Sequence, residues 1–190
     1  SDGDTGSTTI DLQVEDARLA YDYLTKVKGI DANRIGVMGF SLGGGIAILS
    51  AIEDAARYKS MVTWSSVGDF TKDMTGVVGQ EAVDEAATDG VVGLDLGWRT
   101  IVLKQDFFSS LAAHDLASMV TNYSGSFLSI AGSEDFSAAY AEKFVASSKG
   151  ETKEAWIVEG GDHIYGVLGE DQTMANSVIQ KTVEWFAKTL

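Results

Sequence analysis

Hydrophobic and polar residues alternate along this chain in blocks that predict strands and helices in turn. Short apolar runs bounded by turn residues predict buried strands at residues 34–39, 61–66, 127–131 and 154–158. Apolar residues at helical spacing predict helices at residues 7–28, 42–56, 138–148 and 176–190. Because strands that alternate with helices are typical of a parallel sheet, we expect an α/β fold with a mostly parallel sheet flanked by helices.

The stretch between the second and third predicted strands breaks this rhythm. It contains a helical pattern at residues 80–87 and a possible strand pair within residues 91–103. We therefore predict a core formed by residues 1–67 and 123–190, with a cap inserted at residues 68–122. No internal repeat or low-complexity tract interrupts either part.

Composition and charge exclude several classes of function. The formal net charge of −14 would repel nucleic acid and anionic membrane surfaces. No apolar run approaches the roughly 18 residues of a membrane span, so we predict a soluble, cytoplasmic protein. The chain has no cysteine and only two histidines, and we expect neither a metal site nor another cofactor.

A glycine-flanked serine follows the first predicted strand. In the segment Gly39-Phe40-Ser41-Leu42-Gly43, the glycines leave room for a sharp turn from strand to helix, which would expose the serine hydroxyl. The buried strand before it and the apolar helix after it are the context that this motif requires. We predict that Ser41 is a nucleophile and that the backbone N–H of Leu42 binds the developing oxyanion.

The serine needs a general base, and the two histidines are the candidates. His163 lies in a loop directly after the last predicted strand, where its side chain can reach over the sheet edge. His114 lies at the end of the predicted cap, and there we expect a structural residue or one at the substrate's edge. We therefore predict that His163 is the base.

An acid that orients the base should follow a strand and precede the histidine in the chain. Asp135 meets both demands, and its neighbour Glu134 stays as an alternative. Asp162 is adjacent to the predicted base, and adjacent residues rarely present their side chains to each other. We expect Asp162 to stabilise the loop instead.

The three motifs together resemble the α/β-hydrolase superfamily, particularly its dienelactone-hydrolase-like serine esterases. The similar regions are Gly-Phe-Ser-Leu-Gly-Gly, Ala-Gly-Ser-Glu-Asp and Gly-Gly-Asp-His, and the similarity runs through nearly the whole chain. The resemblance implies that Ser41 is the nucleophile, Asp135 the acid and His163 the base. Members of this group commonly have a proline shortly after the acid, whereas Phe136 and Ser137 follow it here.

A second departure concerns the N-terminal part of the fold. Members of the group usually carry several further strands, and an oxyanion loop, before the first helix predicted here. Without them, the strand at residues 34–39 would be an exposed apolar sheet edge, and a second oxyanion donor would be missing. We therefore expect a missing N-terminal segment, or a partner chain, to complete the sheet.

The expected activity is hydrolysis of a small-molecule carboxylic ester through an acyl-enzyme intermediate. Peptidase and thioesterase activities use the same residues and stay open, as does a non-catalytic binding or scaffold role. The predicted cap contains the aromatic residues Phe70, Trp98, Phe107 and Phe108. These side chains suggest an apolar acyl pocket, although they could equally form the core of the cap itself.

Overall fold

The computed structural model describes residues 4–54, 57–97 and 99–190, so Trp98 lies outside the described residues. The strands are β1 (Gly36–Phe40), β2 (Ser60–Trp64), β3 (Val91–Asp95), β4 (Thr100–Lys104), β5 (Ser126–Gly132) and β6 (Lys153–Val158). The helices are α1 (Ile10–Leu24), α2 (Leu42–Glu53), α3 (Phe70–Val78), α4 (Gln80–Asp89), α5 (Gln105–Leu111), α6 (Leu116–Met119), α7 (Ala138–Ser147) and α8 (Thr173–Thr189). Two short 3₁₀ turns are η1 (Thr5–Ser7) and η2 (Val120–Asn122).

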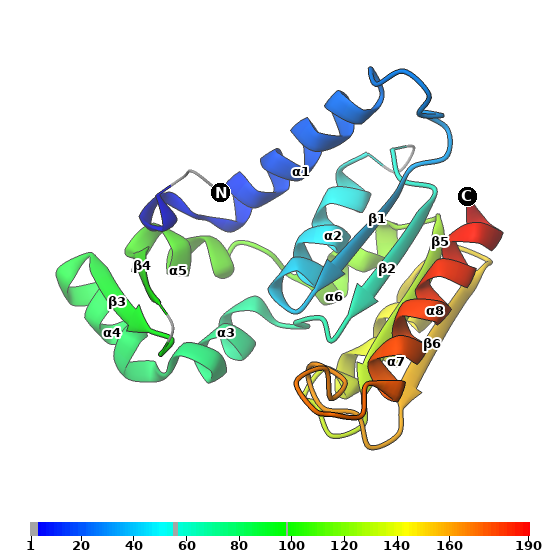
Figure 1. Cartoon of the computed structure of the whole chain (residues 1–190). Coiled ribbons are helices and arrows are strands. Elements are labelled where there is room, and N and C mark those ends of the chain that lie inside the picture. Colours follow the sequence, from blue (N-terminus) through cyan, green and yellow to red (C-terminus); the bar gives the residue numbers. More distant parts are fainter. Residues whose placement is uncertain (1–3, 55–56, 98) are drawn as a thin grey trace.

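A parallel sheet with the strand order β1-β2-β5-β6 forms the centre of the molecule (Figure 1). The register pairs Phe40 with Trp64, and Trp64 with Ile130. The carboxyl ends of these strands therefore lie side by side at one edge of the sheet. This architecture confirms the predicted α/β fold with a mostly parallel sheet flanked by helices.

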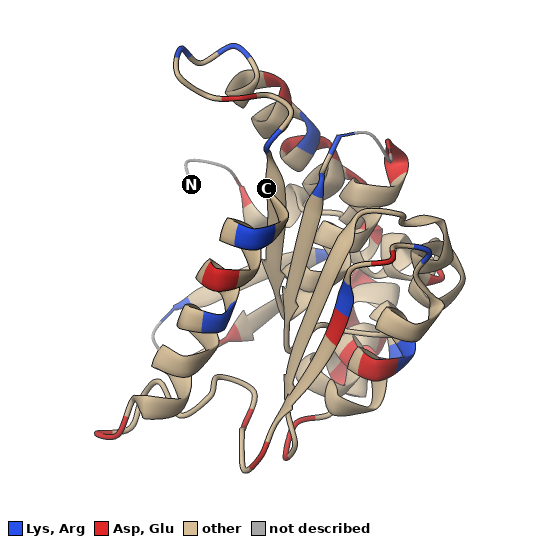
Figure 2. Cartoon of the chain, turned by 90° about the vertical axis from the view of Figure 1, so that its right-hand side faces the viewer, with Lys and Arg blue, Asp and Glu red and all other residues tan. Residues whose placement is uncertain are grey.

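Helices cover both faces of this sheet. Successive strand residues point to opposite faces, so Met61 packs with α2 and the neighbouring Val62 packs with α8. Helix α7 lies on the α2 side, where Phe127 of β5 is fully buried. Charged side chains gather on helices, loops and the outer strand β6, while β1, β2 and β5 carry none (Figure 2). The two central strands, β2 and β5, are thus largely buried between helices.

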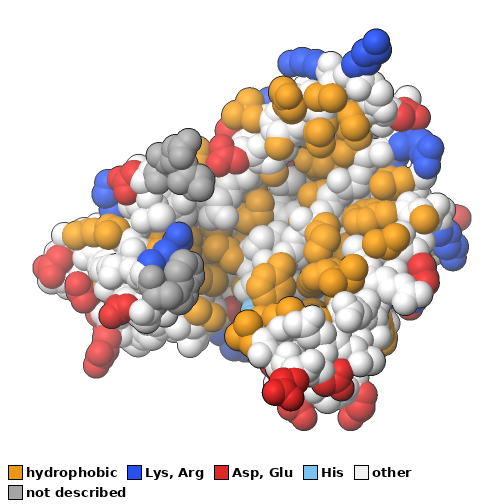
Figure 3. All heavy atoms as spheres, in the orientation of Figure 1, with side chains coloured by type: hydrophobic (Ala, Val, Ile, Leu, Met, Phe, Trp, Pro, Cys, Tyr) orange, Lys and Arg blue, Asp and Glu red, His pale blue; other side chains and the backbone are white. Residues whose placement is uncertain are grey.

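Strand β1 forms one edge of the sheet. Among the described residues, β1 pairs only with β2. Met38 is 43% exposed and Phe40 is 41% exposed, although both belong to an apolar strand. Hydrophobic side chains gather over much of the molecular face that Figure 3 turns toward the viewer. The strand is therefore apolar and open to solvent along its outer edge.

The intervening segment, residues 68–122, stands beside the sheet (Figure 1). Its helices α3 and α4 lead into an antiparallel hairpin of β3 and β4, and α5 and α6 return the chain to β5. The hairpin confirms the predicted strand pair. Val92 and Leu103 face each other across the hairpin and are both buried, and they belong to the same hydrophobic core as the inner face of α2.

Three predicted helix boundaries differ from the structure. Helix α2 ends at Glu53 rather than at residue 56, and residues 55 and 56 lie outside the described residues. Helix α1 begins after Thr9, whose side chain caps it, and ends at Leu24 rather than near residue 28. The next residues form tighter turns, in which the N–H groups of Lys26 and Val27 bond three residues back. Helix α8 begins at Thr173, three residues before the predicted start at residue 176.

No helix within residues 4–54, 57–97 and 99–190 has the length and apolarity needed to cross a membrane.

Candidate active site

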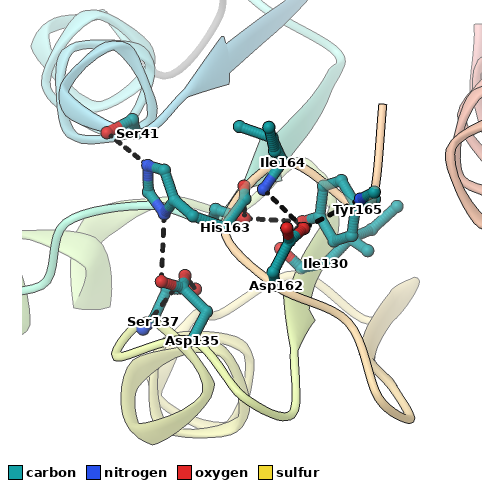
Figure 4. Close-up of polar contacts among 10 residues, drawn as sticks. Ser41, Ile130, Asp135, Ser137, Asp162, His163, Ile164 and Tyr165 are labelled. Atoms are coloured by element: carbon teal, nitrogen blue, oxygen red, sulfur yellow. Dashed lines mark hydrogen bonds and ion pairs between the residues drawn. The ribbon is translucent and has the colours of Figure 1, made fainter. Parts of the chain in front are cut away.

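The aligned carboxyl ends of the parallel strands bring three distant side chains together. Ser41 follows β1, Asp135 follows β5 and His163 follows β6. Nε2 of His163 lies 3.0 Å from Oγ of Ser41, and Nδ1 lies 3.0 Å from Oδ1 of Asp135 (Figure 4). The imidazole therefore stands between a hydroxyl and a carboxylate, with one ring nitrogen facing each.

The turn between β1 and α2 gives Ser41 an uncommon backbone conformation. Its φ is +56°, a region that residues other than glycine seldom adopt. A Cβ at Gly39 would lie only 1.9 Å from the carbonyl oxygen of Gly43, so the turn requires glycine at this position. A Cβ at Gly43 would meet no described heavy atom within 4 Å. Packing within the described residues therefore requires glycine at position 39 but not at position 43.

The start of α2 packs closely against the chain that follows β2. A Cβ at Gly44 would lie 2.5 Å from the Ser66 hydroxyl, and one at Gly45 would lie 2.6 Å from the Phe70 ring. Leu42 is the first residue of this helix. Its N–H belongs to the first turn of the helix, whose donors have no acceptor within the helix itself.

Burial differs between the acid and the imidazole. The Asp135 side chain is only 6% exposed, whereas the His163 side chain is 34% exposed. Ser137 binds the second carboxylate oxygen of Asp135 through its hydroxyl and, at 3.3 Å, through its backbone N–H. The residues that replace the expected proline after the acid therefore supply two donors to the carboxylate, and a proline could not supply the N–H.

Two aromatic rings that the sequence did not single out flank the imidazole. The ring of Phe136 stacks on His163 with centroids 5.5 Å apart, and the ring of Phe40 tilts against it at 5.0 Å. Phe40 precedes Ser41 in the sequence and Phe136 follows Asp135. This adjacency to predicted site residues is the sequence feature from which the two rings could have been predicted. The two rings restrict the orientation of the imidazole.

The alternative candidates lie elsewhere. Glu134 is exposed, and its backbone N–H donates to the carbonyl of Gly161. Oδ1 of Asp162 accepts from the N–H groups of Ile164 and Gly166, which fixes the turn of the histidine loop. Nε2 of the second histidine, His114, lies 3.1 Å from Oδ1 of Asp11 on α1.

The fold and the serine, histidine and aspartate side chains gathered at its strand ends define an α/β hydrolase of the serine-hydrolase class. The chain matches the model of the prolyl oligopeptidase family over residues 9–190 and belongs to that family. No curated protein sequence matches it significantly.

Solved structures of α/β hydrolases share the fold at low sequence identity. Est1E from Butyrivibrio proteoclasticus, with bound ferulic acid, has a TM-score of 0.72 and 18% identity, covering 96% of this chain and 71% of that one. DcsB, in complex with its substrate analogue, has a TM-score of 0.77 and 13% identity, with coverage of 97% and 75%. Dienelactone hydrolase from Anabaena variabilis has a TM-score of 0.62 and 18% identity, with coverage of 95% and 61%. The resemblance predicted from the three motifs is thereby confirmed for the fold.

Proposed function

We propose that this chain is a serine esterase that hydrolyses a carboxylic ester through an acyl-enzyme intermediate. The observation that carries the proposal is the continuous path from Ser41 through His163 to Asp135, with 3.0 Å at each step. Such distances are those expected between a nucleophile, its base and the group that orients the base.

In the first half of the proposed reaction, Oγ of Ser41 attacks the ester carbonyl carbon and its proton moves to Nε2 of His163. Asp135 accepts from the Nδ1–H group, which keeps the lone pair of Nε2 directed at Ser41 and stabilises the imidazolium. The tetrahedral intermediate then collapses, the bond to the alcohol oxygen breaks and His163 returns the proton to the leaving alcohol. Ser41 now carries the acyl group.

In the second half, a water molecule takes the place of the alcohol. His163 accepts a proton from the water as its oxygen bonds to the acyl carbon. The bond to Oγ of Ser41 then breaks, and the proton passes from Nε2 to the serine oxygen. The products are a carboxylic acid and the free enzyme.

The negative charge on the intermediate needs donors, and we assign the N–H of Leu42 to this role. This N–H stands at the positive end of the α2 dipole, next to the nucleophile in the chain. A donor placed there stabilises the oxyanion more than the neutral carbonyl, which is what lowers the barrier.

The intervening segment is proposed to act as a cap that selects the acyl group. A cavity of about 560 Å³ lies between this segment and the residue after the nucleophile. The apolar side chains that line it include Leu42, Met74, Val78, Leu94, Ile101 and Phe107. An apolar acyl chain or ring matches such a lining better than a charged group does.

The aromatic residues of this segment mostly serve its packing rather than the cavity. Phe70 is 1% exposed and packs against α2, and Phe108 is 8% exposed and meets Phe107 edge to face at 5.3 Å. Phe107 alone among these three also lines the cavity. The selectivity is therefore assigned to the aliphatic side chains.

Peptide hydrolysis is the second candidate, because the family is named for an oligopeptidase. The names of several structural neighbours instead point to esters: one is described as an esterase domain from Rhodothermus marinus, and others as lipolytic enzymes. An ester also expels a better leaving group than an amide does. These features favour the ester.

The open edge of β1 lies next to the nucleophile, and we propose that a further strand, from another segment or a partner chain, pairs with it. The apolar side chains of Met38 and Phe40 on this edge would be covered, and a second oxyanion donor could come from the added strand. Native mass spectrometry tests this proposal. A bound partner or second copy supports it, and a stable, active monomer of 20.2 kDa would contradict it.

A substrate panel separates the candidate activities. We expect the wild-type protein to hydrolyse p-nitrophenyl esters of short to medium acyl length faster than prolyl p-nitroanilide peptides. The substitution Ser41→Ala should abolish the activity that is found. Faster peptide cleavage would favour the peptidase, and binding of esters without turnover would favour the non-catalytic scaffold.

A further inference from the structure

We propose that Ser65 is a positioning residue for His163, which its hydroxyl holds through the backbone carbonyl of the histidine. The proposal deepens the esterase function and rests on it for its catalytic meaning. Ser65 is the residue after β2, is fully buried and lies 98 positions before His163. Nothing in the local sequence around Ser65 marks it as part of the site.

Two hydrogen bonds join the histidine loop to the strand ends beneath it, and a third joins those strand ends to each other. The Ser65 hydroxyl donates to the carbonyl oxygen of His163 at 2.8 Å and lies 2.9 Å from the Tyr165 hydroxyl. The Tyr165 hydroxyl donates to the carbonyl oxygen of Ile130 at 3.0 Å, and the Ser65 N–H donates to the same oxygen at 2.8 Å. The loop and the ends of β2 and β5 are thereby joined at one point, and Figure 4 shows Tyr165 of the loop beside Ile130 of β5.

The backbone conformations at this point are uncommon. Among the described residues other than glycine, positive φ occurs at Ser41 (+56°), Ser65 (+44°) and Tyr165 (+55°). Each such residue costs about 1 kcal/mol or more and persists where the surroundings fix it strongly. The strained conformations therefore occur at the proposed nucleophile and at the two residues, Ser65 and Tyr165, whose hydroxyls lie beneath the histidine.

Tyr165 forms the other half of this support. It is 3% exposed, and its ring meets Trp64 of β2 edge to face at 6.2 Å. Burial raises the pKa of Tyr165 to about 12, so its hydroxyl keeps its proton at neutral pH and stays a donor. The apolar ring and the hydroxyl together anchor the loop two residues after the histidine.

The position of the loop that carries His163, relative to the sheet edge, determines whether the imidazole reaches both Ser41 and Asp135. Nε2 must reach Ser41 after β1 and Nδ1 must reach Asp135 after β5, each at 3.0 Å. The flanking rings of Phe40 and Phe136 contact the imidazole ring, whereas Asp162 binds two N–H groups in the backbone of the loop after the histidine. The bond from Ser65 fixes that backbone at the histidine itself.

The substitution Ser65→Gly tests the proposal, because glycine tolerates φ of +44° and lacks only the hydroxymethyl group. Ser129→Ala is the matched control: it removes a hydroxyl of another buried serine, which accepts from Thr63 within the sheet at 2.9 Å. Tyr165→Phe removes the second hydroxyl of the support and keeps the ring.

The first measurement needs no turnover. The sequence has two histidines, so ring-labelled histidine gives two imidazoles in the NMR spectrum, and His114 serves as an internal reference. In the wild type we expect a hydrogen-bonded Nδ1 proton on His163. Ser65→Gly should lose that signal, while the signals of His114 and of Ser129→Ala stay unchanged.

The second measurement is the rate of labelling by a fluorophosphonate. Ser65→Gly should lower this rate roughly 10- to 100-fold, because displacements of about an ångström have effects of that size. Tyr165→Phe should lower it less. An unchanged His163 signal in Ser65→Gly, or a labelling rate within about twofold of wild type, overturns the positioning role. If the wild-type protein shows the Nδ1 proton of His163 but is not labelled by the fluorophosphonate, the esterase proposal is contradicted. The NMR comparison of wild type and Ser65→Gly then decides by itself whether Ser65 positions the histidine.

Discussion

Oγ of Ser41 lies 3.0 Å from Nε2 of His163, although 122 positions separate the two residues in the chain. The parallel register produces this proximity, because it aligns Phe40 of β1, through β2 and β5, with Trp156 of β6. The side chains that follow those ends must then meet above the same sheet edge. The predictions below ask what each part of this arrangement contributes.

The carboxylate of Asp135 should be needed to orient the histidine. We expect Asp135→Asn to lower kcat by about 10³- to 10⁴-fold, because an amide there favours the wrong tautomer. The exposed neighbour Glu134 provides the control, and Glu134→Gln should leave kcat unchanged. Steady-state hydrolysis of one p-nitrophenyl ester measures both. If the Glu134 variant is the one that loses activity, the assignment of the acid is wrong.

The two glycines around the nucleophile should differ in their tolerance of a side chain. Gly39→Ala forces a Cβ to within 1.9 Å of the Gly43 carbonyl, so we expect unfolding to become easier by about 3 kcal/mol or more. Gly43→Ala meets open space in a helix and should change stability by less than about 1 kcal/mol. Urea denaturation of the two variants measures the contrast. Equal destabilisation would show that the backbone of the turn can shift.

The cavity lined by Leu42 and the intervening segment should set the acyl length. Ile101 lines it, whereas its neighbour Val102 is 38% exposed and alternation along β4 directs it to the opposite face. We expect Ile101→Trp to lower kcat/KM for longer acyl esters by roughly 10-fold or more, with little effect on acetate. Val102→Trp should leave the length profile as it is. A profile unchanged in both variants would place the acyl group elsewhere.

Alkaline pH should weaken the fold through Tyr165. Its pKa is raised by burial to about 12, whereas the unfolded chain loses this proton near pH 10. The contribution to stability is therefore fully present below about pH 10 and is lost as the pH rises toward 12, a change on the order of 2 kcal/mol.

Urea midpoints measured across this pH range test the effect. The midpoint of Tyr165→Phe should fall less steeply than that of the wild type. Burial also raises the pKa of Tyr123, so part of the fall should persist in the variant. Tyr23→Phe, at a tyrosine that is 69% exposed, should follow the wild type. An identical fall in wild type and Tyr165→Phe would contradict the buried state of this hydroxyl.

The sequence predicted those features that depend on local patterns. Apolar runs marked the parallel strands, and residues directly after strands marked Ser41, Asp135 and His163, because a parallel sheet gathers its carboxyl ends. The strand pair of β3 and β4 was also visible as a local pattern. Helix ends were less accurate, since the tighter turns after Leu24 depend on hydrogen bonds rather than on periodicity.

The contacts made across the fold could not be predicted in the same way. Ser65 is an ordinary serine after a strand, and its bond to the carbonyl of His163 exists only once β2 and the loop after β6 are adjacent. The pairing of His114 with Asp11 likewise joins residues 103 positions apart. The aliphatic lining of the cavity depends on how the intervening segment meets α2, which no single stretch of sequence specifies.

The most direct test of the central claim is labelling with a fluorophosphonate, followed by peptide mass spectrometry to locate the modified residue. The proposed mechanism predicts one adduct on Ser41, no adduct in Ser41→Ala, and much slower labelling in His163→Gln. The probe forms a bond to an activated serine without requiring any particular acyl specificity. A wild-type protein left unmodified at Ser41, or an adduct that persists in Ser41→Ala, would contradict the claim that Ser41 is the nucleophile.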